Sequence, residues 1–223
     1  MTDAHFHRNT YDTFLSLEGR EVAFFGIHPW QSAACGVSAE EIAADLRRRI
    51  AENPHAGVGE IGLDRLKTKN IPDLQRTIFE TQLALAAEFR RPVVLHGAKC
   101  WGEVVKACLP FVGRIPAFLF HGFSRSAGLL PEIVALNGFV SVGPALLNDH
   151  AVNYRDMVKA LPLDRVLLET DKDWSSPLEE GAPTQESLLA DLAHTLSRLK
   201  NCPLEALSSD LSANTARFVE ALA

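Results

Sequence analysis

Short apolar runs alternate with longer amphipathic stretches along the whole chain. The apolar runs are nearly continuous, which is typical of parallel strands that are covered on both faces of a sheet. Six runs are predicted to be buried strands: Glu21–His28, Ala56–Ile61, Pro92–His96, Ile115–His121, Gly138–Val142 and Arg165–Thr170. The residues around His5-Phe6-His7 form a seventh candidate strand at the start of the chain.

The stretches between these strands place apolar residues at helical spacing. Six helices are predicted: Ala39–Asn53, Asp73–Phe89, Trp101–Leu109, Leu129–Leu136, Thr184–Leu199 and Leu204–Ala221. Ser38 and Glu41 form the S-x-x-E pattern of a capping box at the start of the first helix. The alternation continues without a break in composition, so we expect one α/β domain over residues 1–223.

Two common architectures place parallel strands beside helices. No G-x-G-x-x-G pattern follows the first strand, so a dinucleotide-binding fold lacks its main signature. The alternative is a closed barrel, whose functional site lies at the carboxyl ends of the strands.

Composition narrows the setting in which this domain is expected to work. No apolar run reaches the roughly 18 residues of a membrane-spanning helix, and no secretory signal is recognised, so we expect a cytoplasmic protein. Cys35, Cys100, Cys108 and Cys202 form no C-x-x-C pair, which indicates buried thiols in a reducing cytosol rather than a zinc knuckle.

The net charge of −6 argues against a protein that coats nucleic acid nonspecifically. It does not exclude an enzyme that acts on phosphates, because bound divalent cations would invert the local field.

Titratable residues gather where the predicted strands end. His5 and His7 are two residues apart, so in a strand both side chains point to the same side. The later strands end in the same residue types: His28, Glu60, Asp64, His96, His121, Glu169 and Asp171. Burying these groups together is costly unless something pairs them, and divalent metals bind imidazole and carboxylate. His5 and His7 are therefore predicted to be metal ligands.

Several of these residues lie in short motifs that follow one another in a fixed order. The motifs are Asp3–His7 (D-x-H-x-H), Gly26–Pro29 (G-[IV]-H-P), Gly59–Asp64 (G-E-[IC]-G-L-D), Gln75–Gln82 (Q-x-x-x-F-x-x-Q), Pro92–His96 (P-V-x-[IL]-H), His121–Ser124, Leu167–Asp171 (L-L-x-E-T-D) and Asn214-Thr215. In this order the sequence resembles the TatD-like metal-dependent deoxyribonucleases of the amidohydrolase superfamily, nearly from end to end.

The resemblance implies a site with two divalent metal ions, Mg²⁺, Mn²⁺ or Zn²⁺. One ion would be held by His5, His7 and Asp171, and the other by His96 and His121, with Glu60 bridging them. Asp171 and Glu60 would be the catalytic carboxylates, and Asp171 would orient the attacking water and accept its proton.

Three further residues receive supporting roles from the same resemblance. His28 is expected to contact a substrate phosphate rather than a metal. Asp64 and Glu169 are expected to hold imidazoles in the right tautomer, although a helix cap or a structural ion pair would explain either residue as well.

The loops expected to face the substrate depart from the family pattern. Lys172-Asp173-Trp174 stands where the family has S-P and a loop with proline and arginine, and Ala98-Lys99 replaces an Arg-Asp pair. The element H-C-F-[ST]-G becomes His121–Arg125. Lys99, Arg125 and Lys172 are candidates for the missing phosphate contacts, and each is equally consistent with plain surface charge.

A second departure concerns the barrel itself. Between His7 and Gly26 the family fits a helix, a second strand and another helix, whereas this chain has only Arg8–Phe25. A crossover with its helix needs about ten or more residues. We therefore expect a TIM-barrel-like fold that is incomplete, with seven strands, the second βα unit missing, a side opening and Tyr11–Leu17 covering the gap.

Three functions remain in competition. The leading hypothesis is a metal-dependent hydrolase of phosphodiesters, a TatD-type deoxyribonuclease with DNA or another phosphodiester as substrate. The alternative is an enzyme of the same superfamily that acts on a small amide, ester or lactone. A non-catalytic binding module is the third, and the intact ligand set argues against it. Trp30, Trp101 and Trp174 follow strand ends and suit either a flat aromatic substrate or packing at the rim.

Overall fold

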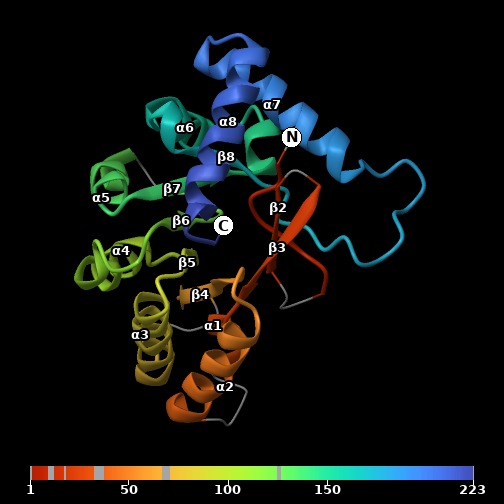
Figure 1. Cartoon of the computed structure of the whole chain (residues 1–223). Coiled ribbons are helices and arrows are strands. Elements are labelled where there is room, and N and C mark those ends of the chain that lie inside the picture. The colour runs from red at the N-terminus through yellow and green to blue at the C-terminus, as the bar shows by residue number, and fades with distance from the viewer. Residues whose placement is uncertain are drawn as a thin grey trace.

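Eight strands form one sheet in chain order. The computed structural model describes residues 2–9, 13–17, 19–32, 38–66, 71–124 and 127–222. The strands are β1 (Phe6–His7), β2 (Thr13–Leu17), β3 (Arg20–Phe25), β4 (Gly57–Asp64), β5 (Val93–Ala98), β6 (Phe118–Phe120), β7 (Gly138–Val142) and β8 (Val166–Leu168). Figure 1 shows the strands at the centre of the molecule and most helices around them.

The predicted barrel-like α/β fold is confirmed, but the predicted count of seven strands is wrong. The strands from β3 to β8 pair in parallel, whereas β2 pairs antiparallel with both β1 and β3. The Arg8–Phe25 segment is too short for a helical crossover, but antiparallel strands need only a tight turn between them. Thr13–Leu17 therefore fills the expected gap as a strand, and seven of the eight strands run in one direction. Residues 11 and 12 of the expected cover lie outside the described residues.

The two ends of the sheet meet through backbone hydrogen bonds. The Ala4 amide donates to the Leu168 carbonyl at 2.7 Å, and the Asp171 amide donates to the His5 carbonyl at 3.0 Å. His7 donates to Lys172 at 2.8 Å and accepts from Trp174 at 2.9 Å. These bonds place β1 beside the end of β8, so the first and last strands of the described sheet are joined, and β2 stands where the side opening was expected.

Eight α-helices accompany the strands in the described part of the chain. They are α1 (Pro29–Ser32), α2 (Ala39–Glu52), α3 (Asp73–Glu88), α4 (Trp101–Cys108), α5 (Leu130–Ala135), α6 (Val152–Ala160), α7 (Gln185–Lys200) and α8 (Leu204–Val219). Short 3-10 helices occur at Leu109–Phe111, Ala127–Leu129, Pro144–Leu147, Leu163–Arg165 and Glu220–Leu222. None of the helices described is both long and apolar enough to span a bilayer.

All six predicted helices are confirmed, and two helices were missed. The capping box is present, because Ser38 and the side chain of Glu41 exchange the two expected hydrogen bonds at the start of α2. The sequence did not indicate α6, since Met157 and Val158 are its only buried residues and no apolar stripe develops. The four-residue α1 is too short to show a period.

The strands separate two packed cores because successive side chains point to opposite faces. Val93, Leu95, Phe118 and Phe120 face outward into the larger core, which they share with the helices. Val94, Leu119, Phe139 and Leu167 belong to a second core, together with Phe218, Val219 and Leu222 from the end of the chain. Figure 1 shows the C-terminal end of α8 near the middle of the strands. The end of α8 thus packs against the inward residues of the sheet.

Candidate metal centre

Glu60 lies at the centre of the predicted ligands. Every residue of β4 is buried, and the Glu60 side chain is only 5% exposed. Its Oε1 lies 2.7 Å from His96 Nδ1, 2.8 Å from His121 Nε2 and 3.2 Å from His28 Nε2. Its Oε2 faces the other way, 3.6 Å from His5 Nε2. The two oxygens of one carboxylate therefore face two different sets of imidazoles.

Close approach of β4 and β5 brings His96 to Glu60. Gly62 has φ of 153°, and a Cβ there would lie 2.0 Å from the His96 carbonyl oxygen. Only glycine fits this position, because any side chain would push the two strands apart. The second glycine of the G-E-I-G-L-D motif is thus explained by the distance between the strands.

Asp171 joins the two histidines of β1. Its Oδ1 lies 3.4 Å from His5 Nε2 and 3.6 Å from His7 Nε2. Its backbone is in the left-handed region with φ of 50°, and its amide donates to the His5 carbonyl. The Asp171 side chain is 45% exposed, so this edge of the cluster opens to solvent.

The side chains brought together fit a divalent metal ion. Three sets of ligand atoms lie within 4.8 Å of one another: His5, Glu60 and His121; His5, His7 and Asp171; and His28, Glu60 and His96. Both ring nitrogens of His5 and Nδ1 of His7 are buried and make no hydrogen bond to the described residues. Buried imidazole nitrogens are rarely left without a partner. A bound cation would supply that partner, and neutral imidazole with carboxylate is its usual donor set.

Asp64 holds the far side of the His96 ring. It is 1% exposed, and its Oδ2 lies 3.1 Å from His96 Nε2. The same oxygen accepts the indole N–H of Trp30 at 2.5 Å, and Oδ1 accepts the Leu66 amide at 2.6 Å. Burial alone would raise the pKa of Asp64, but the hydrogen bonds from His96 and Trp30 lower it below its usual range. Because an ionised Asp64 can only accept a hydrogen bond, the proton of the neutral His96 ring lies on Nε2. The other ring nitrogen, Nδ1, is then unprotonated and faces Glu60.

Glu169 lies beside His121 in the corresponding way. Its Oε2 is 3.6 Å from His121 Nδ1 and accepts the Ser141 hydroxyl at 2.5 Å. Its Oε1 accepts the amide of Gly122 at 2.9 Å. Both carboxylates expected to support imidazoles are therefore next to the imidazoles in question.

The burial of these charges sets the protonation of the cluster. Burial would raise the pKa of Glu60, but the charge of His121 and hydrogen bonds from His121, His28 and His96 hold it well below its usual value. Burial alone would lower the pKa of His121, but the negative charge of Glu60 more than offsets this effect. The pKa of His121 is therefore raised. Burial also opposes the ionised form of Asp171, yet its contacts with His5 and His7 lower its pKa. Both acidic groups are thus ionised at neutral pH, as ligands must be.

His28 has a fixed tautomer. The Trp30 amide donates to its Nδ1 at 3.1 Å, so the proton of the neutral ring is on Nε2, facing Glu60. Burial is the main cause that lowers the pKa of His28 and favours this neutral ring. His28 therefore faces Glu60 as a hydrogen-bond donor. Its position also brings it into the set of possible ligand atoms with Glu60 and His96.

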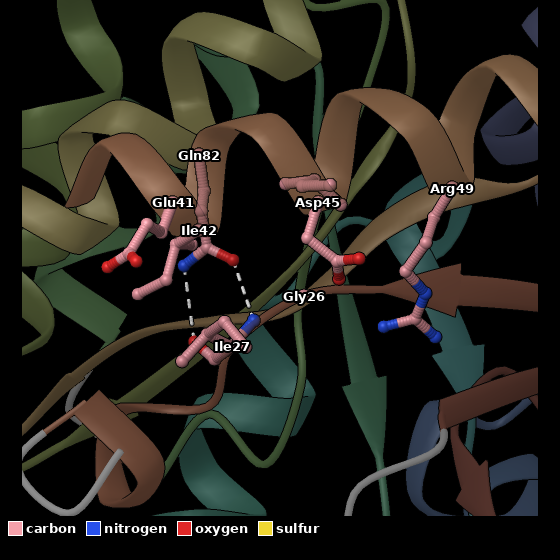
Figure 2. Close-up of a pocket in the computed structure, with 8 residues that line it drawn as sticks. Gly26, Ile27, Glu41, Ile42, Asp45, Arg49 and Gln82 are labelled. Atoms are coloured by element: carbon pink, nitrogen blue, oxygen red, sulfur yellow. Dashed lines mark hydrogen bonds between the residues drawn. The ribbon is translucent and has the colours of Figure 1, made fainter. Parts of the chain in front are cut away.

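Two glutamines of α3 hold the loop that carries His28. Gln82 accepts the Ile27 amide at 2.6 Å and donates to the Ile27 carbonyl at 3.2 Å, as Figure 2 shows. Gln75 accepts the Asp64 amide at 3.0 Å and donates to the Pro29 carbonyl at 3.3 Å. The sequence showed the motif but not this role, because a buried glutamine side chain carries no periodic signal.

A cavity of about 230 Å³ lies beside the contact between Gln82 and Ile27. The residues around it come from α2, α3 and the end of β3: Gly26, Ile27, Glu41, Ile42, Asp45, Leu46, Arg49 and Gln82. None of the predicted ligands lines it. The cavity is therefore separate from the metal centre.

Asp3 is a structural anchor that sequence reasoning did not identify. The buried carboxylate accepts the amide and the hydroxyl of Thr170 at 3.0 and 2.6 Å, and the side-chain amide of Gln185 at 2.8 Å. It ties the start of β1 to the residues after β8 and to α7. Its place in the D-x-H-x-H motif was the only available signal.

The predicted substrate contacts are less well gathered than the ligands. Lys99 and Lys172 are exposed and follow β5 and β8, and the Lys172 ammonium lies 5.6 Å from the centre of the Trp174 ring. Arg125 lies outside the described residues.

The expectation that all three tryptophans lie at the rim is wrong for Trp101. This side chain is 3% exposed and packs on Phe120 and Phe123. Its ring sits against Gly97, where a Cβ would come within 2.3 Å of it. Trp30 remains 43% exposed, and Trp174 is half-buried.

Comparison with known proteins gives relatives in bacteria. A metal-dependent hydrolase of Bacillus subtilis, YabD, is 28% identical over 180 residues, which cover 80% of this chain and 71% of the relative. YjjV of Escherichia coli is 30% identical over 200 residues, 86% of this chain and 74% of the relative. The 3'-5' ssDNA/RNA exonuclease TatD of Erwinia tasmaniensis is 32% identical over 154 residues. That match covers 68% of this chain but only 58% of the exonuclease.

Solved structures agree with the fold. The crystal structure of E. coli YjjV matches with a TM-score of 0.71 and 27% identity over 88% of this chain and 76% of that one. A TatD family hydrolase from Entamoeba histolytica matches with a TM-score of 0.72 over 88% of this chain and 74% of that one, and at 18% identity it supports the fold alone.

The resemblance noted in the sequence is thereby confirmed. The family described as TatD related DNase matches residues 2–220, which is nearly the whole chain. The chain belongs to the TatD-related DNase family.

Proposed function

We propose that this protein is a divalent-metal-dependent hydrolase that cleaves phosphodiester bonds in single-stranded nucleic acid. We assign one ion to His5, His7 and Asp171 and a second to His96 and His121, with Glu60 shared between them. The identity of the ions in this proposal is Mg²⁺ or Mn²⁺. The three described cysteines are free thiols, which supports a reducing, cytoplasmic setting.

The observation that carries the proposal is the position of Glu60. Its Oε1 faces His96 and His121, whereas its Oε2 faces His5 and His7 at 3.6 and 4.0 Å. A carboxylate that bridges two ions presents one oxygen to each of them. Sites with two ions about 3.5–4 Å apart suit the in-line displacement at phosphorus.

The chain's own residues then divide the work at this site. Bound divalent ions would supply Lewis acidity and a water of lowered pKa. Asp171 is ionised and half open to solvent, so it can orient the attacking water and accept its proton. His28 carries its proton on Nε2 and can donate it in a hydrogen bond to a phosphate oxygen. Asp64 and Glu169 fix the rings of His96 and His121.

Relatives support the choice of substrate. The Erwinia protein is named as an exonuclease on single-stranded DNA and RNA, and the family as DNases. The net charge of −6 does not oppose this choice, because the bound cations supply the local positive field.

A small amide, ester or lactone is the second candidate substrate. The same centre could activate water for either bond. The observation that favours this candidate is the position of the exposed Lys172, whose ammonium lies over the Trp174 ring, 5.6 Å from its centre.

Metal analysis combined with a substrate screen tests the proposal. The purified protein should contain about two divalent ions per chain and should cleave short single-stranded DNA or a bis-aryl phosphodiester when Mg²⁺ or Mn²⁺ is present. If the metal-loaded protein hydrolyses a small amide or lactone but leaves every phosphodiester intact, the second candidate replaces the first.

A further inference from the structure

Trp30 combines exposure with a fixed orientation. It is 43% exposed, whereas large aromatic side chains are usually more deeply covered. Its indole N–H donates to the buried Asp64 at 2.5 Å, so the polar edge of the ring is anchored while 43% of the side chain stays exposed. An exposed aromatic ring held in this way costs little ordering entropy when a ligand packs on it.

The Trp30 ring lies next to the candidate metal centre. Its centroid lies 4.6 Å from that of His28 and 6.1 Å from that of His96. The Nε2 of His28 is in turn 3.2 Å from Glu60. A substrate whose phosphate reaches Glu60 and the imidazoles around it can therefore place a neighbouring group on Trp30.

Hydrogen bonds hold both the helix that carries Trp30 and the carboxylate that binds its indole N–H. Trp30 belongs to α1, where the Ser32 hydroxyl donates to Pro29 at 2.7 Å and Gln31 accepts the His28 amide at 3.0 Å. The other oxygen of Asp64 accepts the amide of Leu66, whose side chain is 59% exposed. One buried carboxylate thus holds an imidazole of the centre, the exposed ring of Trp30 and the backbone at Leu66.

We propose that Trp30 is a stacking platform for the nucleobase next to the scissile phosphate. The inference rests on the function proposed above and names the part of the substrate that this surface recognises. Every nucleobase offers a flat π face, so a platform of this kind binds all sequences. Duplex bases have both faces covered by neighbours, and the platform therefore selects single strands.

The test measures KM for a set of short single-stranded DNAs, each with one abasic site at a different position. It is made on the wild type and on two substitutions of Trp30. In the wild type, removal of the base that contacts Trp30 should raise KM by about 5- to 150-fold, the range of base–aromatic stacking. Trp30→Phe keeps a ring but loses the bond to Asp64, and it should keep most of this penalty. Trp30→Leu lacks a ring and should lose the penalty at that one position. Equal abasic penalties in the wild type and Trp30→Leu at every position would overturn the platform.

A control and a second readout separate this result from other causes. Leu109→Ala removes an apolar side chain of comparable exposure, 51%, far from the strand ends and should leave every penalty unchanged. Equal metal content in Trp30→Phe and Trp30→Leu would show that any difference between them comes from the ring.

Photo-cross-linking also decides the case in which no phosphodiester is cleaved and the proposed function fails. Metal-loaded protein and single-stranded DNA with 5-iodouracil should give a cross-link at Trp30, mapped by mass spectrometry. A cross-link confined to other residues, or none, would contradict the platform whatever the enzyme hydrolyses.

Discussion

The two sides of Glu60 are built differently. On one side, which we call the braced side, His96 and His121 each have a buried carboxylate behind the ring, Asp64 or Glu169. On the other, the open side, the Nε2 atoms of His5 and His7 face Asp171 at 3.4 and 3.6 Å, and the side chain of Asp171 is 45% exposed. A carboxylate behind an imidazole orients the ring before an ion binds, and Nδ1 of His5 and His7 has no such partner among the described residues. We infer that the braced side is preorganised and that the open side is completed on binding.

The largest expected effect comes from the residue that the two sides share. Glu60→Ala should lose both ions, whereas His7→Ala should lose only the ion of the open side. Loss of the centre removes several kcal/mol of transition-state stabilisation, roughly 10³-fold or more in kcat. Elemental analysis of the two variants, with His7→Ala as the matched control, measures the difference. Unchanged metal content in Glu60→Ala would mean that Glu60 does not bridge.

The second prediction isolates the open side. Asp171→Asn removes one ligand and the proposed proton acceptor, so kcat should fall by about 10²- to 10⁴-fold, as is usual for a general base. The braced side should keep its ion, and the variant should therefore contain about one ion per chain. Retention of both ions together with full activity would remove Asp171 from the mechanism.

The same contrast shows how far the sequence could lead. The gathering of the predicted ligands was predictable because each lies in a strand or next to one, and the carboxyl ends of parallel strands meet at one end of a barrel. The tautomer of His28 was not predictable, since it depends on a backbone amide two residues later that only the turn of α1 brings to Nδ1. Nor was the role of Gln82, which binds a loop 55 residues away in the chain.

The fold was predictable in the same uneven way. The near-continuous apolar strands and the helical spacing indicated the α/β barrel and six of its helices. The number of residues between β1 and β3 correctly excluded a helical crossover. It did not reveal that Thr13–Leu17 would enter the sheet, because an antiparallel strand of five residues has too few positions to show a convincing alternation.

The third prediction weakens the braced side alone. Asp64→Asn replaces the charged acceptor of His96 and should reduce affinity for that ion by about 10- to 100-fold, the usual cost of losing such a partner. The open-side ion should be unaffected, so a chelator should remove the two ions in separate steps. Asp149→Asn, at an 89% exposed aspartate, is the matched control. Equal loss of both ions would show that the two sides act as one unit.

The smallest expected effect concerns the cationic residues that follow Asp171 and His121 in the sequence. Lys172 directly follows Asp171, and Arg125 follows the strand end that carries His121. A phosphodiester has a permanent negative charge, so cations that bind phosphates away from the reacting bond contribute uniform binding. The double charge reversal Lys172→Glu and Arg125→Glu should therefore raise KM by about 10-fold and change kcat much less.

Salt dependence shows whether that change in KM comes from binding of phosphates. With a single-stranded substrate, the slope of log KM against log salt should fall by about 0.7 for each phosphate that the variant no longer neutralises. Lys159→Glu on α6 reverses a charge that already pairs with Asp156 and should leave both KM and slope unchanged. Metal content should equal that of the wild type, which separates weaker phosphate binding from damage to the neighbouring Asp171. A fall in kcat with constant KM would instead mean that these cations act in the chemical step. An unchanged salt slope would mean that they are ordinary surface charges.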